Sequence, residues 1–350
     1  MFSLIDYNYD LPEKFIAQKP LKERDGSKLL FLNRKTGKLS HHEFSGILGF
    51  FSPGDVLVVN NTEVIPGRLL GRKETGGKAE VLILDYAGGK TSSGEFTSEC
   101  LLNASKPTKT GTFIFFGDGL KAEVTGSFNG LYSLKFYCNQ DFESLLYKKG
   151  KIPLPPYIKR EGINPPGNDK LDYQTVYASE KGAIAAPTAG LHFTTELIEK
   201  LKLRGVEIAE ITLHVGYGTF SPVRSFDIRN HRMHSERFIL PESTADKINR
   251  ARKEGHRIIA VGTTCVRTLE FVSDKKGTVH SGSGTCDLFI YPGYTFKVVD
   301  AMVTNFHLPK STLLMLVSAF AGRENVLVAY KEAIEKRYRF YSYGDAMLIH

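Results

Sequence analysis

Apolar and polar positions follow two different patterns along the chain, and these patterns predict two structural units. Between residues 66 and 150, apolar residues form short runs separated by glycine and polar turns, such as 79–84, 112–116 and 131–136. This spacing is typical of a small all-β module, either a barrel or a sandwich. Elsewhere, strand-like runs alternate with helix-like ones, which indicates an α/β fold. The patterning therefore predicts an α/β body that is interrupted by a β insertion.

Residues 183–237 show the clearest succession of elements. Extended residues lead into a tight turn near His192, then a helix capped by Thr194 or Thr195, then an alternating strand that ends near His214. A polar residue at the carboxyl end of a strand, followed by a glycine-rich turn, marks the place where open α/β sheets bind ligands. A structural role is the better explanation for either histidine alone, but the two together favour a site.

Two other stretches place polar groups at predicted helix starts. Residues 262–264, Gly-Thr-Thr, lie between a strand and a helix that carries Arg267 in its first turns, and the free N–H groups of such a start bind anions. A plain helix cap with a surface arginine explains these residues equally well. His307 and Lys310 precede a second helix that Ser311 would cap. Because a lysine opposes the positive end of a helix dipole, an anionic partner explains Lys310 better than solvation alone.

Basic residues gather in two places. Four arginines lie between residues 224 and 237, around a His-x-x-His pair that lacks a nearby third metal ligand, so phosphate contacts are favoured over zinc. Lysines and an arginine also bracket the stiff proline segment 152–157, where neighbouring tyrosines would complete an RNA surface. A solvated loop and a solubilising rim are the ordinary alternatives. Asp287 borders a predicted strand in apolar surroundings, where a carboxylate needs a partner or a function.

Composition narrows the class of protein. The 350 residues carry a net charge of +8, which favours a polyanionic partner. Four scattered cysteines argue against both a zinc site and a disulfide framework, and indicate a reducing compartment. The amino terminus lacks a signal-peptide pattern, and the longest apolar run, 312–321, is shorter than the ~20 residues of a membrane span. The residues alone thus predict a cytoplasmic, non-membrane α/β enzyme with an anion-binding cleft and an RNA partner.

Six blocks, in order and spread over nearly the whole chain, resemble the S-adenosylmethionine:tRNA ribosyltransferase-isomerase family of queuosine biosynthesis. They are residues 10–12 (DLP), 54–62 (GDVLVVNNT), 186–194 (APTAGLHFT), 213–220 (LHVGYGTF), 304–312 (TNFHLPKST) and 343–349 (YGDAMLI). The chain departs from the family pattern at four positions. It has Lys28 and Glu63 where the family usually has arginine, Gly67 in place of alanine, and Cys265 in place of serine.

The resemblance implies a reaction on tRNA. The ribosyl part of S-adenosylmethionine would be transferred to the 7-aminomethyl group of a deazaguanine at the wobble position, and would rearrange to an epoxycyclopentanediol as adenine and methionine leave. S-adenosylmethionine is the implied donor substrate, no metal is required, and the tRNA anticodon loop is the implied partner of a monomer. The implied fold is a large α/β domain with an open, barrel-like mixed sheet, residues 1–65 and 151–350, and an inserted small all-β barrel, residues 66–150.

The implied chemistry gives each candidate residue a role. Because a sulfonium acidifies the neighbouring ribose carbon, His192 or His214 is a candidate base, and Asp287 or His307 would protonate the leaving adenine. Residues 262–264 would hold the methionine carboxylate, while Lys310 and the arginine-rich loop would hold anticodon phosphates. The predicted substrate-binding residues are Thr188, Gly190, Gly216, Gly218, Thr219, Thr263, Thr264, Arg267, Asn305, Lys310 and Ser311. The predicted RNA-binding residues are Lys149, Lys151, Lys159, Arg160, Arg232 and Arg237.

Two other functions stay open on the sequence. An S-adenosylmethionine-dependent RNA methyltransferase would need a glycine-rich loop for the methyl donor, and none is evident. Gly216-x-Gly218 lacks the third glycine of a dinucleotide fingerprint and is weak evidence for a Rossmann site. A non-catalytic RNA-binding protein would not need histidines at the ends of strands and helices.

Overall fold

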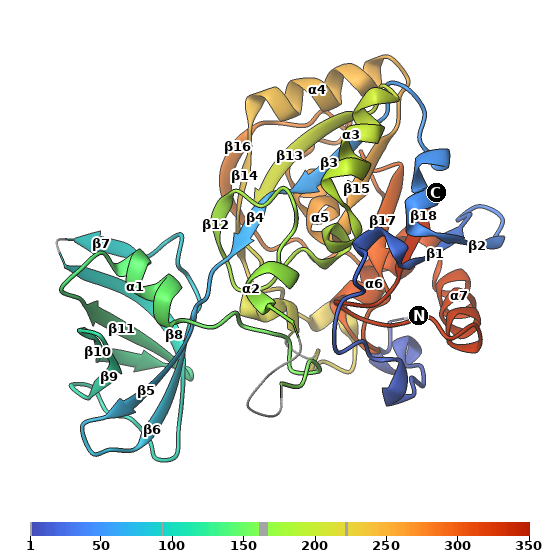
Figure 1. Ribbon diagram of the computed structural model, residues 1–350. Helices are drawn as coiled ribbons and strands as arrows, with labels where there is room; N and C mark the ends of the chain where they lie inside the picture. The colour runs from blue at the N-terminus through green and yellow to red at the C-terminus, as the bar shows by residue number, and fades with distance from the viewer. Residues whose placement is uncertain (1, 93, 161–166, 221–222) are drawn as a thin grey trace.

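The protein is built on two large β-sheets, one of which lies to one side of the other in the computed structural model of Figure 1. The structure describes residues 2–92, 94–160, 167–220 and 223–350. Among these residues, no single helix is long and apolar enough to cross a membrane, and α6 (Thr312–Ala321) and α7 (Arg323–Glu335) meet that test of length and composition only together, as a pair bent by 112°.

The larger unit is an open, nine-stranded mixed sheet. Its strand order is β16 (Gly282–Cys286), β14 (Glu236–Leu240), β13 (Glu207–Leu213), β3 (Val56–Asn60), β15 (Ile258–Val261), β17 (Ala301–Asn305), β18 (Ala346–Ile349), β1 (Lys28–Leu32) and β2 (Leu39–Glu43). The four central strands from β13 to β17 are parallel, and antiparallel pairs flank them on both sides. The predicted α/β class with a mixed sheet is confirmed.

Both faces of this sheet are covered, which explains the continuous apolar run of β3. Val56 and Val58 pack into one apolar cluster with α4 (Glu242–Lys253), α5 (Gly262–Val272), α6 and α7. Leu57 and Val59 pack on the other face, against α3 (Thr195–Leu203) and a 3-10 segment, Phe44–Phe50. Strands with two buried faces lose the polar alternation of a half-exposed sheet.

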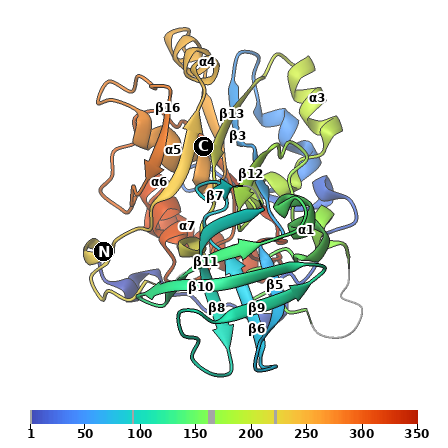
Figure 2. The same cartoon turned by 90° about the vertical axis from the view of Figure 1, so that its left-hand side faces the viewer.

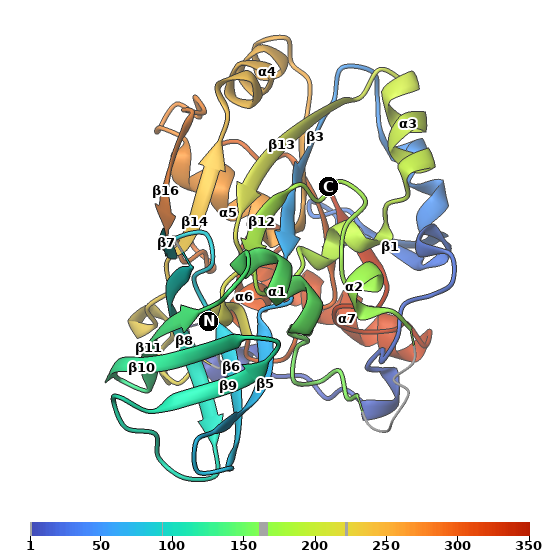
Figure 3. The same cartoon turned by 60° about the vertical axis from the view of Figure 1, so that its left-hand side comes forward.

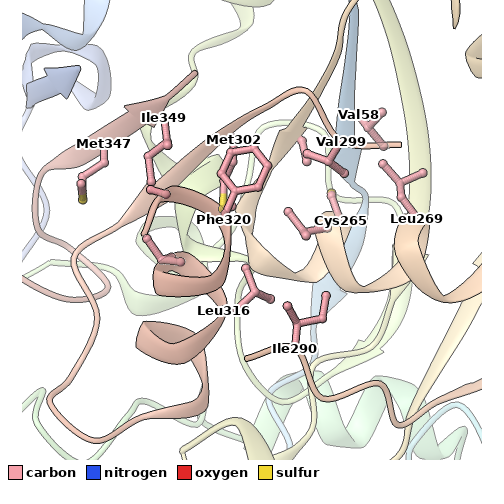
Figure 4. Close-up of a cluster of buried hydrophobic side chains, with 14 of the residues drawn as sticks. Val58, Cys265, Leu269, Ile290, Val299, Met302, Leu316, Phe320, Met347 and Ile349 are labelled. Carbon is pink, nitrogen blue, oxygen red and sulfur yellow. The ribbon is translucent and has the colours of Figure 1, made fainter. Parts of the chain in front are cut away.

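Figure 4 shows part of the first cluster, where side chains from α5 and α6 meet those of the sheet. Cys265 and Leu269 come from α5, and Leu316 and Phe320 from α6, opposite Met302 of β17. Each fully buried side chain of this size contributes roughly 1.5–3 kcal/mol to folding. This packing fixes the positions of α5 and α6 relative to the strand ends.

Helix boundaries follow the capping residues in the sequence. The side chain of Thr194 accepts a hydrogen bond from the N–H of Leu197 at 3.1 Å, and α3 is followed by Gly205 at a φ of +83°. Ser311 caps α6 in the same way, accepting from the N–H of Leu314 at 3.2 Å. Such side chains satisfy amide groups that a helix start leaves without partners. The predicted helix starts at 194 and 311 are confirmed.

The smaller unit is a closed, six-stranded antiparallel barrel, because β11 pairs with β10 on one side and with β8 on the other. Its strands, with β7 paired outside the ring, are β5 (Arg68–Lys73), β6 (Lys78–Ile83), β7 (Lys90–Ser92), β8 (Glu95–Ala104), β9 (Phe113–Gly117), β10 (Leu120–Phe128) and β11 (Leu131–Tyr137). Helix α1 (Phe142–Lys149) packs Phe142 against Phe96 inside the barrel, with ring centroids 4.3 Å apart. The expected β module is thus a barrel rather than a sandwich (Figure 2).

The chain enters and leaves the barrel at one place. A short parallel ribbon of β4 (Thr62–Val64) and β12 (Glu180–Ala183) lies on the large-sheet side of this place, near the short helix α2 (Asp169–Asp172) (Figure 3). The backbones of Arg68 and Lys151 exchange two hydrogen bonds, at 3.1 and 2.9 Å. A Cβ at Gly150 would lie 1.9 Å from the carbonyl oxygen of Pro66. The predicted domain boundaries at 65/66 and 150/151 stay a prediction.

We expect Gly150→Ala to destabilise the protein by about 1–3 kcal/mol, because the added methyl group would push the two connections apart. Urea unfolding measures the change in the free energy of unfolding. Gly46→Ala is the matched control, since nothing lies within 4 Å of a Cβ at that exposed position. Equal stabilities for the two variants would contradict the close approach.

Candidate active site

A cavity of about 310 Å³ opens at the carboxyl ends of the parallel strands, and we call it the strand-end cavity. It lies where β15 leads into α5 and where β17 leads into the loop before α6, and Val215, just after β13, adds to the wall. This is the edge at which open α/β sheets bind ligands, and the volume lies in the range of about 300–1,000 Å³ found for small-molecule sites. The polar lining residues are Thr188, Thr263, Thr264, Thr304, Asn305, His307, Lys310, Ser311 and Ser342.

Two helices begin at this cavity. Helix α5 starts at Gly262, whose φ of +84° favours glycine, and α6 starts after Ser311. The Oγ1 of Thr264 is buried and has no hydrogen-bond partner within the described structure. Lys310 is the one charged side chain among the described lining residues. Helix amino termini and an ammonium group together make this wall of the cavity attractive to an anion.

His307 is the histidine that lines the cavity. The Nε2 of its ring lies 2.8 Å from the Oγ1 of Thr304, and its backbone N–H donates to the hydroxyl of Tyr330 at 2.8 Å. Its carbonyl accepts from the hydroxyl of Tyr9, so the amino-terminal segment helps to fix this loop. Burial lowers the pKa of His307 to about 3, which keeps the imidazole neutral at neutral pH.

His192 lies behind the cavity wall and holds one of its residues. The Nδ2 of Asn305 is 3.2 Å from the Nε2 of His192, and the Nδ1 of His192 is 2.7 Å from the Oγ of Ser27. Because the amide is the donor, Nε2 accepts and Nδ1 carries the proton that goes to Ser27. The Oδ1 of Asn305 is thereby turned toward Thr188, whose hydroxyl donates to it at 3.0 Å. Burial lowers the pKa of His192 to about 3, so this histidine is also neutral.

Comparison with known proteins identifies the family. A sequence model described as "Queuosine biosynthesis protein" matches residues 4–349. The chain belongs to this queuosine biosynthesis family. It is 51% identical over 347 residues to the S-adenosylmethionine:tRNA ribosyltransferase-isomerase of Syntrophotalea carbinolica, with 99% of each chain covered. The enzyme of the same name from Geobacter sulfurreducens is 49% identical over 345 residues, with 98% of each chain covered.

A solved structure agrees with this assignment. The crystal structure of S-adenosylmethionine tRNA ribosyltransferase from Thermotoga maritima is similar to this fold with a TM-score of 0.55 and 39% sequence identity, over 99% of this chain and 100% of the other. The family resemblance inferred from the six sequence blocks is therefore confirmed.

The structure brings together seven of the residues that the sequence predicted for the family's site. They are Thr188, Thr263, Thr264, Asn305, His307, Lys310 and Ser311. Their specific roles stay predictions. Tyr341 and Ser342 also line the cavity, although they were not among the predicted site residues. Tyr157, one of the tyrosines predicted to complete an RNA surface beside the proline segment, lines it as well. The sequence signal for Tyr341 and Ser342 is the Tyr-Ser-Tyr-Gly-Asp block after the last helix.

The second predicted histidine lies elsewhere. His214 is half-buried near the barrel, with its Nδ1 2.8 Å from the Oγ1 of Thr62, and it does not line the strand-end cavity. Burial lowers its pKa, and Asp85 from the barrel unit opposes that shift. The expected convergence of both histidines on one pocket is therefore wrong. The side chain at the strand end turns toward the junction between the two sheets instead.

Other predicted residues also lie outside the cavity wall. Asp287 is exposed just after the edge strand β16, so its predicted apolar setting is wrong. Gly190 and Gly218 allow close packing, since a Cβ would lie 2.1 Å from the hydroxyl oxygen of Tyr177 and 2.4 Å from the Cδ2 of His234, respectively. Thr219 belongs to a 3-10 turn, Tyr217–Phe220, and its side chain lies outside the described structure.

Arg267 is buried, and its guanidinium is held by protein groups. Its guanidinium pairs with Glu236 and donates to the carbonyl oxygens of Leu288 and Cys286, at 3.1 and 3.3 Å. The second oxygen of Glu236 accepts from the N–H of Gly216 at 2.8 Å. The pair thus fixes the turn that follows β13 beside the cavity. The predicted substrate contacts of Arg267 and Gly216 stay predictions.

Most of the predicted RNA-binding residues have carboxylate partners. Lys149 pairs with Asp118, Lys159 with Glu13, Arg160 with Asp169, and Arg237 with Asp85. Lys151 and Arg232 are exposed without a carboxylate partner in the described ranges. An arginine that already forms two bonds to a carboxylate, as Arg237 does at 3.0 Å each, is a weak candidate for a phosphate contact.

The four residues that depart from the family pattern have different surroundings. Lys28 donates to the carbonyl of Lys336 at 2.9 Å, close to the end of α7, and Glu63 accepts from the hydroxyl of Tyr147 across the junction. A Cβ at position 67 would lie 3.1 Å from the Cδ1 of Ile65, so the larger residue needs a small shift. Burial raises the pKa of Cys265, which packs in the apolar cluster beneath the site.

The buried pair predicts a large effect on stability. Arg267→Ala would leave the Glu236 carboxylate buried without its partner, so we expect a loss of about 3–5 kcal/mol. Urea unfolding measures this loss. Arg250→Ala removes an exposed pair with Glu207, at 2.7 Å, and should cost no more than about 1 kcal/mol. Similar losses in both variants would contradict the structural role of Arg267.

Burial of His192 predicts acid destabilisation. Its pKa is lowered to about 3 in the folded protein, whereas an unfolded histidine titrates near 6.5. Unfolding therefore takes up a proton between these two values, and stability falls as the pH drops from about 6.5 toward about 3. His192→Asn should reduce the slope of unfolding free energy against pH by about 1.4 kcal/mol per pH unit in that window. Urea unfolding at several pH values measures the slope, and an unchanged slope at constant urea dependence would refute the burial effect.

Proposed function

We propose that this protein transfers and isomerises the ribosyl group of S-adenosylmethionine onto the 7-aminomethyl-7-deazaguanine at the wobble position of tRNA, giving epoxyqueuosine and releasing adenine and methionine. The observation that carries the proposal is the strand-end cavity, which joins an unpartnered buried hydroxyl and two helix amino termini to aromatic walls. Membership in the family, whose relatives bear the name of this activity, supports the same reaction.

One wall of the cavity carries helix amino termini, and another carries aromatic rings. These two walls match the carboxylate and the sulfonium, which are the two ends of the methionine part of the donor. The carboxylate fits the start of α5, where Thr264 lacks a partner. The sulfonium fits the rings of Tyr157, Phe306 and Tyr341, because a cation is attracted to the face of an aromatic ring. Tyr157 and Tyr341 lie with ring centroids 4.7 Å apart and form one side of this wall.

His307 is the best-placed candidate for the base that removes the ribose proton. Its ring lines the cavity, and its neutral state avoids repulsion with the sulfonium. Thr304 engages Nε2, while Nδ1 has no hydrogen-bond partner in the described part of the chain. A neutral imidazole is not a strong acid, so His307 does not suit the role of protonating adenine that the sequence suggested.

Lys310 is the acid that the cavity offers to the leaving adenine. Its φ of +57° is unusual for a side-chain-bearing residue, and its backbone N–H donates to the carbonyl of Tyr7 at 2.8 Å. The amino-terminal segment thus holds Lys310 in a strained conformation at the cavity wall. His192 lies behind the cavity wall and acts as a positioning residue, because its ring orients the amide of Asn305.

The nucleotide target must leave its loop to reach this cavity, as it does in enzymes that modify a base. We propose the anticodon loop as the part of tRNA that binds over the opening, with Lys151 and Arg232 among its contacts. We also propose a monomer that acts in the cytoplasm, where tRNA and S-adenosylmethionine are both found. Light scattering by the purified chain measures its molar mass and so tests whether it is a monomer.

Products of a single incubation test the reaction. The purified chain is mixed with labelled S-adenosylmethionine and a tRNA that carries the aminomethyl-deazaguanine. We expect adenine and methionine to appear in equal amounts with label in the tRNA. S-adenosylhomocysteine instead would indicate methyl transfer, and tRNA binding without any product would indicate a binding protein.

Variants in the cavity test the assigned roles. His307→Gln should lower kcat by about 10²- to 10⁴-fold, because it removes the candidate base. Thr264→Val should raise KM for S-adenosylmethionine about 10- to 100-fold with little change in KM for tRNA, because a hydrogen bond to a charged group is lost.

His214→Gln is the matched histidine control outside the cavity, and it should keep kcat within about 3-fold of the wild type. A normal rate for His307→Gln, or a lost rate for His214→Gln, would overturn the assignment of the base.

A further inference from the structure

Four exposed residues form a row across the outside of the barrel. Lys78 of β6 pairs with Arg72 of β5, Arg72 with Phe115 of β9, and Phe115 with Lys121 of β10. Residues directly opposite each other on neighbouring strands project from the same face. We call these four residues the barrel row. It spans three strand spacings of about 4.8 Å, or roughly 14 Å.

The barrel core does not require the aromatic ring in this row. Phe115 is 45% exposed, while its neighbours Ile114 and Phe116 face the barrel interior and are buried. Leu70, 48% exposed, lies beside the row, and a groove of about 700 Å³ runs along it. An exposed phenylalanine between two cations on the barrel surface is typical of a binding surface rather than of a packed core.

The cations of the row are not neutralised. Arg72 donates to the carbonyl of Gly76 at 2.9 Å, Lys121 lies over the rings of Phe113 and Tyr137, and Lys78 has no partner in the described part of the chain. Glu80 also lines the groove, but Arg68 holds both of its carboxylate oxygens, at 2.7 and 3.0 Å. The row therefore keeps a net positive charge, unlike the paired basic residues near the proline segment.

This arrangement matches the chemistry of RNA. Cations spaced along a line neutralise phosphates, and an exposed ring between them stacks an unpaired base. A protein partner would not need three unneutralised cations around one ring. We propose that the barrel row binds the backbone of the tRNA substrate and stacks one of its unpaired bases on Phe115. This inference rests on the proposed function for the identity of the RNA.

The row lies outside the strand-end cavity, so substitutions in the row should change tRNA binding alone. Binding at the barrel should change the affinity for tRNA and its salt dependence, but not the affinity for S-adenosylmethionine or kcat at saturating tRNA. The barrel would then serve as a second point of attachment, away from the chemistry.

The charge test uses Arg72→Ala, Lys78→Ala and Lys121→Ala combined. Fluorescence anisotropy with labelled tRNA and no S-adenosylmethionine should show a Kd raised at least about 10-fold, and a slope of log K against log salt reduced by roughly 2–3, as expected for three lost phosphate contacts. The matched control combines Lys200→Ala, Lys253→Ala and Lys275→Ala, three exposed lysines of the large unit with no carboxylate partner in the described structure. It removes the same charge and should leave Kd within about 3-fold of the wild type.

The stacking test uses Phe115→Ala, which should raise Kd for tRNA by about 5- to 150-fold, and Phe115→Tyr, which keeps the ring and should restore binding. Thermal unfolding of each variant checks that the barrel is intact. If the row and control variants bind tRNA equally well, the row is not an RNA surface.

Activity separates this inference from the proposed function. Adenine release with unchanged tRNA binding in the row variants overturns the barrel row alone. The opposite result is that the unmodified chain releases no adenine while the row variants bind tRNA more weakly. This result supports RNA binding by the barrel row and overturns the proposed reaction.

Discussion

The parallel pairing of β15 with β17 is the constraint on which the site depends. Because the two strands run side by side in the same direction, the segments that follow them emerge at the same edge of the sheet. One segment turns directly into α5, and the other forms the His307–Ser311 loop before α6. Two helix amino termini and their polar residues therefore meet in one cavity. The apolar packing of α5 and α6 against the sheet keeps them there (Figure 4).

Local sequence signals predicted the elements that depend on local chemistry. Ser311 and Thr194 mark helix starts because their side chains satisfy amides three residues away, and this requires no knowledge of the rest of the fold. Residues 286–291 and 296–306 also look like strands in the sequence, but β16 ends at Cys286 and β17 covers only Ala301–Asn305. For residues 297–299 the reason is a contact with a residue distant in sequence. The buried carboxylate of Glu270 accepts the N–H groups of Lys297, Val298 and Val299, so this backbone is held by a side chain rather than by a neighbouring strand.

The location of lining residues was predictable where they follow a strand or precede a helix directly. Thr263 and Thr264 follow β15, and His307, Lys310 and Ser311 precede α6, so the ends of these elements fix where they lie. The direction of a side chain is set by tertiary packing, and the spacing of residues in the sequence does not predict it. His192 and His214 have the same sequence signal, yet one supports Asn305 behind the cavity and the other contacts Thr62 at the junction.

The junction between the two units has a consequence for how the chain folds. The large sheet must bring β3 next to β13 and β15, although the barrel residues separate them in sequence. An unfolded insertion would be a long loop, whose closure is entropically unfavourable. Once the barrel has formed, Arg68 and Lys151 are neighbours, and the same connection behaves as a short one. The barrel is thus placed to form early, since its contacts are closer in sequence. Its closure then shortens the loop that must close when β3 pairs with β13 and β15.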